Sequence, residues 1–153
     1  MLNGDRKSYE EIVELPIYKK AREISDLVMK IADLIPDDNG HLEDVRRYIT
    51  ENALLLPAKV VAAEGGHIYD LRMENATLVR KYARELMVSY HTLKMHDFEH
   101  AEYYMMVREL IEEFRLLFID WVAGFDQWNY VRDTWGLFNP PGVSPFDEDS
   151  DEE

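Results

Sequence analysis

The sequence predicts an all-α protein, an antiparallel up-down-up-down four-helix bundle followed by an aromatic C-terminal extension and an acidic tail. Apolar residues recur in rows seven positions apart over four long segments, as they do on the buried faces of bundled helices. The connections between these segments are short, so neighbouring helices are expected to run antiparallel. We divide the chain into a polar lead-in (1–14), the bundle (15–125), the extension (126–146) and the tail (147–153), which we expect to be disordered.

Length and composition fit a single globular domain. The chain has 153 residues, of which 46% are hydrophobic and 31% charged, and this size can bury a sizeable core. It has no cysteine, which excludes a disulfide framework, a thiolate zinc site and a cysteine nucleophile. The first residues lack the apolar stretch of a secretion signal, and no apolar run approaches the roughly 20 residues that cross a bilayer. We therefore expect a cytoplasmic protein that does not enter the membrane.

The charge of the chain is strongly negative and unevenly distributed. The formal net charge is −14, and residues 147–153 hold six acids. Of the 31 acidic residues, 25 lie outside this segment, against 17 basic residues, so the body of the protein is acidic as well. Sequence-independent binding of nucleic acid needs clustered positive charge. The composition therefore disfavours nucleic acid as a partner, and the tail fits a basic protein partner better.

The first helix is predicted over residues 15–35. Pro36 should end it, because proline disfavours the helical conformation in the residue before it. Its two apolar rows comprise Ile17, Ile24 and Ile31, with Ala21, Val28 and Ile35 beside them.

The second helix, predicted over residues 41–64, carries more apolar surface than one small bundle can hide. Leu54, Leu55, Val61 and Ala62 are apolar although they lie outside its core rows. A helix that is hydrophobic nearly all round is buried nearly all round, so we expect these four residues to form the interface of a homo-oligomer. The core rows comprise Leu42, Ile49, Leu56 and Ala63, with Ala53 and Val60 beside them.

The end of this helix is marked by a proline, a glutamate and two glycines. Pro57 removes one backbone hydrogen bond and should kink the helix. Gly65-Gly66 can adopt the left-handed conformation that closes a helix. Glu64 is expected to accept hydrogen bonds from N–H groups at this junction or to pair with an arginine such as Arg72. Glu64 and His67 also match the Glu-x-x-His spacing of di-iron bundles, but the glycines break the helix that would align them, so we expect no metal site.

Two further helices are predicted over residues 71–95 and 98–125, with Asp97 as the N-cap of the last one. The rows of the third helix comprise Ala76, Ala83 and Tyr90, with Val79, Leu86 and Leu93 beside them. The rows of the fourth helix comprise Tyr104, Ile111, Phe118 and Phe125, with Val107, Phe114 and Trp121 beside them.

The extension over residues 126–146 loses this periodicity. Its large apolar side chains are spaced irregularly around Asn139-Pro140-Pro141-Gly142, and each aromatic one can bury roughly 150 Å² or more. We therefore expect a short helical turn followed by a segment that lies against the bundle or a neighbouring subunit. The side chains concerned are Trp128, Tyr130, Val131, Trp135, Leu137, Phe138 and Phe146.

Several motifs follow one another in a recognisable order: Leu15-x-x-Tyr18-x-x-Ala21, the pair Arg46-Arg47, Pro57 in an apolar run, Ala63-Glu64-Gly65, and a long helix with Ala83 and Tyr90-x-Thr92-Leu93. Over roughly residues 15–125 this order resembles the 23S rRNA intervening-sequence proteins, a four-helix-bundle family. The resemblance implies a small homo-oligomer, commonly a pentameric ring, with no known catalytic activity. A relative in diversity-generating retroelements is an accessory protein that binds a reverse transcriptase and nucleic acid through basic surfaces. The spacing of Pro57 from Glu64-Gly65 departs from the family pattern.

Arg84 and His91 carry an enzymatic alternative. Their spacing matches a loose pattern of helical ribonucleases from prokaryotic toxin systems. His91 would be the general base and Arg84 would stabilise charge on the phosphate. Because this spacing is common by chance, we expect both to be ordinary surface residues, and we expect no cofactor.

A basic strip across the second and third helices is a further candidate, formed by Arg46, Arg47, Arg80 and Lys81. Acidic neighbours on the same helices favour ordinary i,i+4 pairing instead. The sequence as a whole predicts a non-enzymatic, homo-oligomeric interaction or scaffold protein. The alternatives are a helical ribonuclease-like enzyme and an RNA or reverse-transcriptase accessory protein.

Overall fold

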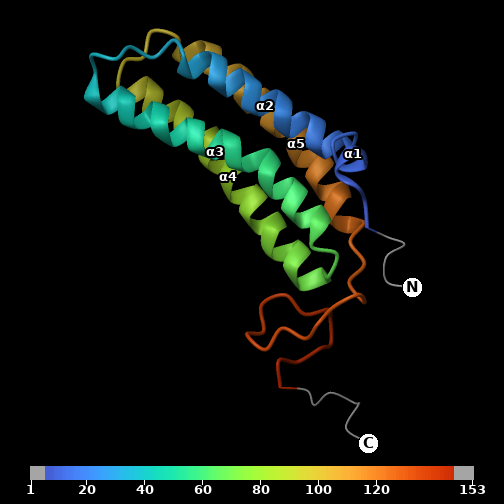
Figure 1. Cartoon of the computed structure of the whole chain (residues 1–153). Coiled ribbons are helices and arrows are strands. Elements are labelled where there is room, and N and C mark those ends of the chain that lie inside the picture. Colours follow the sequence, from blue (N-terminus) through green and yellow to red (C-terminus); the bar gives the residue numbers. More distant parts are fainter. Residues whose placement is uncertain (1–5, 147–153) are drawn as a thin grey trace, which may run out of the picture.

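The computed structural model of the chain describes residues 6–146, and every regular element among them is helical (Figure 1). This confirms the prediction of an all-α protein. No described helix is both long and apolar enough to cross a membrane. The long helices are α2 (Pro16–Ala32), α3 (Gly40–Gly65), α4 (Tyr69–Met95) and α5 (Met105–Ala123); the short elements are α1 (Tyr9–Ile12) and the 3-10 helix η1 (Ala101–Tyr104).

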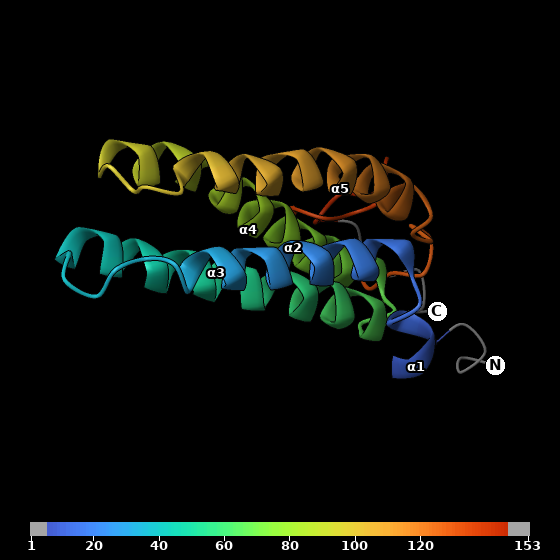
Figure 2. The same cartoon turned by 90° about the horizontal axis from the view of Figure 1, so that it is seen from above.

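The long helices lie side by side around one apolar core (Figures 1 and 2). The most extensive contact joins α3 and α4, and α4 packs much less closely against α5. Every residue of the rows predicted for the first three long helices is buried. Tyr104 is the largest side chain that is fully buried. Its hydroxyl donates a hydrogen bond to the Leu86 carbonyl at 2.5 Å, which ties η1 to α4.

Local sequence explains where the helices start. Pro16 stands at the beginning of α2, where the missing proline N–H costs nothing. Asn39 caps α3, because its Oδ1 accepts hydrogen bonds from the N–H groups of His41 and Leu42 at 3.1 and 3.2 Å. The predicted starts of the first three long helices are therefore close to the observed ones. The end predicted for the first helix is wrong, because α2 ends at Ala32 with Asp33 as its C-cap, before Pro36 is reached.

The last helix starts later than predicted because Asp97 ends α4 instead of opening the next helix. Asp97 has a φ of 57°, the left-handed conformation favoured just beyond a helix end. The Phe98 N–H donates to the Leu93 carbonyl at 3.0 Å and the Asp97 N–H to the Lys94 carbonyl at 3.1 Å. This pair of hydrogen bonds is the Schellman motif. The prediction of an N-cap at Asp97 and a helix from residue 98 is therefore wrong.

The residues before α2 have more structure than the polar lead-in that was predicted. Ser8 and Glu11 form a reciprocal capping box, in which each side chain accepts a hydrogen bond from the other's backbone N–H. Ile12 of α1 is buried. A segment of four residues is too short to show apolar periodicity, so the pattern gave no sign of this helix.

The α3–α4 junction also differs in detail from the prediction. Helix α3 continues through Pro57, which is buried, as far as Gly65. Gly66 has a φ of −83°, so the turn does not use the left-handed glycine expected at Gly65-Gly66. A Cβ at Gly66 would lie 3.3 Å from the Ala62 carbonyl oxygen, so close packing is what favours glycine there.

The extension contains turns but no helix within the described residues. The expected turn at its start is a single one, in which the Asn129 N–H donates to the Asp126 carbonyl at 3.3 Å. In Figure 1 it leaves α5 and crosses the end of the helical body where α3 meets α4. The prediction that residues 147–153 are disordered lies outside the described residues.

Candidate functional site

The four apolar residues predicted as an interface, here called the α3 apolar face, are only partly covered by their own chain. Leu54 is 55% exposed, and Leu55, Val61 and Ala62 are each partly exposed. The face borders a shallow depression to which α1 and α2 contribute Tyr9 and Tyr18. Short α1 thus shelters one edge of the face without closing it.

Glu64 lies at the junction of three helices and is 5% exposed. Its Oε1 accepts hydrogen bonds from Trp121 Nε1 at 2.6 Å and from Arg72 Nη2 at 3.0 Å. Its Oε2 lies 3.6 Å from the Lys7 Nζ. The carboxylate therefore joins the end of α3 to the start of α4, the end of α5 and the residues before α1. The predicted pairing of Glu64 with Arg72 is confirmed. The hydrogen bond from Trp121 to Glu64 was not predicted, because the two residues lie far apart in the sequence.

Two aromatic side chains, Phe125 and Trp121, pack around Arg72 and Glu64 at the end of α5. The Arg72 guanidinium lies over the Phe125 ring, 4.1 Å from its centroid, an arrangement that attracts a cation to an aromatic face. Phe125 in turn packs edge-on against Trp121, with 4.9 Å between ring centroids. Among the described residues, the partners of the Glu64 carboxylate are two cations and one N–H donor, so the cluster stabilises the junction of the three helices.

The backbone of the extension is fixed to this end of the molecule by Asn129. Its side-chain amide donates a hydrogen bond to the His67 carbonyl at 2.7 Å, and its carbonyl accepts one from the Tyr69 N–H at 2.8 Å. The backbone of the extension therefore lies against the α3–α4 junction. The sequence predicted a position against the bundle or a neighbouring subunit without naming this junction, and it based that on aromatic side chains of which Trp128 is 66% exposed.

Beyond Asn129, one carboxylate organises a tight loop. Asp133 accepts hydrogen bonds from the N–H groups of Trp135, Leu137 and Phe138 at 2.8–2.9 Å. These backbone donors, that of Phe138 foremost, hold the pKa of the Asp133 carboxyl below its usual range. The loop presents its large side chains outward: Trp135 is 94% exposed and Leu137 is 73% exposed. The extension thus adds a second uncovered apolar surface, which we call the Asp133 loop.

The four residues of the candidate basic strip do not act as one surface, because some of them are paired with neighbouring groups and others are exposed. Arg46 is committed to the α2–α3 connection, where it donates to the carbonyls of Ala32 and Ile35 and pairs with Asp37 at 2.8 Å. Arg47 is highly exposed and lies 3.8 Å from Asp44. Arg80 and Lys81 are exposed on α4.

The candidate catalytic pair lies on one helix. Arg84 and His91 are both exposed on α4, seven residues apart, which is roughly 10 Å along a helix axis. His91 packs edge-on against the Tyr90 ring, with 5.4 Å between centroids. No group of three or more histidine or acidic side chains among the described residues is arranged to hold a metal ion.

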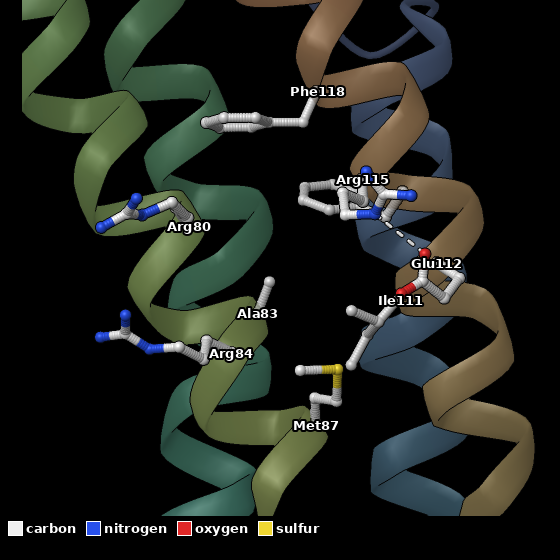
Figure 3. Close-up of a pocket in the computed structure, with 9 residues that line it drawn as sticks. Arg80, Ala83, Arg84, Met87, Ile111, Glu112, Arg115 and Phe118 are labelled. Atoms are coloured by element: carbon white, nitrogen blue, oxygen red, sulfur yellow. Dashed lines mark hydrogen bonds and ion pairs between the residues drawn. The ribbon is translucent and has the colours of Figure 1, made fainter.

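A groove opens where α4 and α5 pack loosely, and Arg84 stands at its edge. It encloses about 130 Å³, and its floor is apolar. Figure 3 shows Phe118 and Ile111 pointing from α5 toward α4, with Met87 below them. We call this feature the α4–α5 groove; its lining residues are Arg80, Ala83, Arg84, Met87, Ile111, Glu112, Phe114, Arg115 and Phe118.

Comparison with protein-family models, with curated proteins and with solved structures finds no match to this chain. Any function must therefore be argued from the residues themselves.

Proposed function

We propose that this chain is an antiparallel up-down-up-down four-helix bundle that self-associates and serves as a non-enzymatic interaction scaffold. The observation that carries the proposal is the exposure of the α3 apolar face in the isolated chain. Leu54, at 55% exposed, occupies the middle of a long helix whose opposite side is fully packed. A second copy is a natural cover for such a face, because the same face is present on every molecule.

A comparison of the free energies of burial and association supports more than one contact between copies. Burying an exposed leucine side chain is worth about 1.5–3 kcal/mol, whereas association costs at least about 4 kcal/mol in lost rigid-body freedom. The α3 apolar face alone would therefore give a weak contact. Trp135 and Leu137 of the Asp133 loop add further apolar area, and aromatic side chains contribute most at protein interfaces. A loop already fixed by hydrogen bonds also loses little conformational entropy on binding.

The proposal is tested by placing a charge in the middle of the α3 apolar face. Leu54→Asp combined with Leu55→Asp should weaken self-association by at least about tenfold, because a charge buried in an interface is costly. Sedimentation equilibrium gives the dissociation constant, and the unfolding midpoint in urea shows whether the single chain still folds.

Val88→Asp is the matched control, because Val88 is 44% exposed on α4, outside the α3 apolar face. It should leave the dissociation constant within about twofold of the original. Equal weakening by both variants would show that the contact does not use the α3 apolar face. Loss of folding in the Leu54→Asp, Leu55→Asp chain would show that this face is internal.

A further inference from the structure

We propose that Phe146 and the acidic segment 147–153 of one copy dock into the α4–α5 groove of a second copy. This inference rests on the proposed self-association and adds to it a contact of a different kind. The groove, the charges at its edge and the composition of the segment carry the argument.

The groove has the size and chemistry to take an aromatic ring. Its floor is formed by buried apolar side chains, among them Ile111 and Phe114, which are 6% and 2% exposed. Its volume is about 130 Å³ and it is open to solvent on one side. The volume is similar to that of the enclosed apolar cavity of roughly 150 Å³ that binds benzene in another protein. Phe146 carries a ring of that size and is 89% exposed in its own chain.

The edge of the groove is positive, which is unusual on so acidic a protein. Arg80 and Arg84 leave α4 at the edge of the groove, and their guanidinium groups point away from α5 (Figure 3). Both side chains are exposed, so they can turn toward a ligand that lies in the groove. Neither makes a hydrogen bond or an ion pair with another described residue. On the other side, Arg115 pairs with Glu112 at 2.9 Å. Three arginines and one glutamate therefore surround an apolar slot on a chain whose net charge is −14.

The complementary ligand is an aromatic group followed directly by carboxylates. Phe146 is followed by Asp147, Glu148 and Asp149, and six of the seven residues 147–153 are acidic. With the ring in the groove, the next carboxylates reach the arginines at its edge, since each extended residue advances the chain by roughly 3.3–3.6 Å. Arginine suits this role, because its guanidinium binds carboxylates with two parallel hydrogen bonds.

The exposure of Phe146 points to a second copy as the source of the segment. Within one chain Phe146 lies outside the groove, with nearly all of its side chain uncovered. A contact between the groove of one copy and the segment of the next is head-to-tail, and such contacts close into rings or continue as filaments.

The decisive experiment is removal of residues 146–153 from the otherwise complete chain. Nonspecific electrostatics predict tighter association, because the shortened chain loses six negative charges and copies repel one another less. Docking predicts the opposite, a dissociation constant that rises by about tenfold or more in sedimentation equilibrium. An unchanged or smaller dissociation constant overturns the inference and leaves the proposed function standing, whereas an original chain that stays monomeric overturns both.

Charge reversal tests the other partner of the contact. Arg80→Glu with Arg84→Glu should weaken association as much as the truncation does. Arg47→Glu with Lys94→Glu changes the net charge equally at exposed positions away from the groove and should have little effect. Equal weakening by both pairs would overturn docking at the groove.

Mixing distinguishes docking between copies from docking within one chain. The Arg80→Glu, Arg84→Glu chain keeps its acidic segment, and the truncated chain keeps its groove. Their mixture should associate more strongly than either chain alone, with circular dichroism confirming that both are folded. A mixture that behaves as the sum of its parts overturns a contact between copies.

Discussion

At the scale of single residues, two carboxylates hold together neighbouring segments at the end of the molecule where α3 meets α4. Glu64 is buried and holds the ends of three helices together through Trp121, Arg72 and Lys7. Asp133 is exposed to solvent on one side and gathers the backbone N–H groups of its own loop. Both carboxylates thus bind groups of their own chain. In this they differ from exposed charged side chains, which are available to bind another molecule.

Removing the Glu64 carboxylate should destabilise the protein strongly. Glu64→Ala leaves the Arg72 guanidinium, whose side chain is 17% exposed, without its anion, and loss of one partner of a buried pair costs about 3–5 kcal/mol. Glu64→Gln keeps one acceptor, the amide oxygen, for Trp121 and should cost clearly less. Urea unfolding followed by circular dichroism measures both changes. A Glu64→Ala protein as stable as the original would show that the cluster does not stabilise the junction.

Acid should loosen the Asp133 loop before it unfolds the helices. The pKa of the Asp133 carboxyl is lowered in the folded loop, so its contribution is complete above the ordinary aspartate pKa of about 3.9. It is lost as the pH falls through the lowered value. Hydrogen exchange at the Trp135, Leu137 and Phe138 amides reports the change. Asp133→Ala should expose these amides at neutral pH, and amides that stay protected in this variant would contradict the assignment.

At the scale of the elements, apolar periodicity determined the long helices well and their ends less well. The segment predicted over residues 41–64 is α3 (Gly40–Gly65), and the one predicted over 71–95 is α4 (Tyr69–Met95). The rows persist over several turns, so the core side of each helix could be read from spacing alone. The ends of a helix depend on only one or two residues. Aspartate is favourable both as the N-cap that starts a helix and in the left-handed conformation just beyond a helix end, so the sequence alone did not decide the role of Asp97.

Asp97 provides a direct test of how α4 ends. Asp97→Gly should stabilise the protein by up to about 1 kcal/mol, because glycine adopts a positive φ without the steric cost of a side chain. An N-cap at this position would instead lose a few tenths of a kcal/mol on substitution by glycine. Thermal unfolding distinguishes the two signs, and a lower melting temperature would contradict the Schellman motif at the end of α4.

The two sides of α3 should respond differently to truncation. Leu56 is fully buried and Leu54 is 55% exposed, although they are only two residues apart. Leu56→Ala should cost about 2–5 kcal/mol in the free energy of unfolding, whereas Leu54→Ala should change it by less than about 0.5 kcal/mol. Chemical denaturation at a concentration low enough to keep the chain monomeric measures both. Similar losses would mean that Leu54 belongs to the core.

The candidate functional surfaces were only partly visible in the sequence. Surplus apolar residues on one helix identified the α3 apolar face, because helical spacing shows which residues the core cannot use. The α4–α5 groove was not foreseen, since Arg80, Arg84 and Arg115 come from two helices whose loose packing no spacing reveals. The Asp133 loop was not foreseen either. The sequence predicted that its large apolar side chains lie against the bundle or a neighbouring subunit, whereas Trp135 and Leu137 are exposed in the single chain.

At the scale of the whole molecule, net charge and exposed apolar surface have opposite effects on association between copies. A net charge of −14 drives copies apart, and this repulsion weakens as salt is added. In the proposed self-association, burial of the α3 apolar face and the Asp133 loop acts against this repulsion, and its contribution does not depend on salt in this way. In the proposed docking of the acidic segment at the arginine-edged groove, charge assists the contact.

Whether copies of this chain associate is measured most directly by its molar mass in solution. Light scattering coupled to size-exclusion chromatography, run across micromolar concentrations at physiological salt, separates the two cases. Self-association predicts a mass of two or more times the 18.1 kDa of one chain, approaching a fixed multiple as concentration rises. A mass that stays at 18.1 kDa over the whole range would contradict the account.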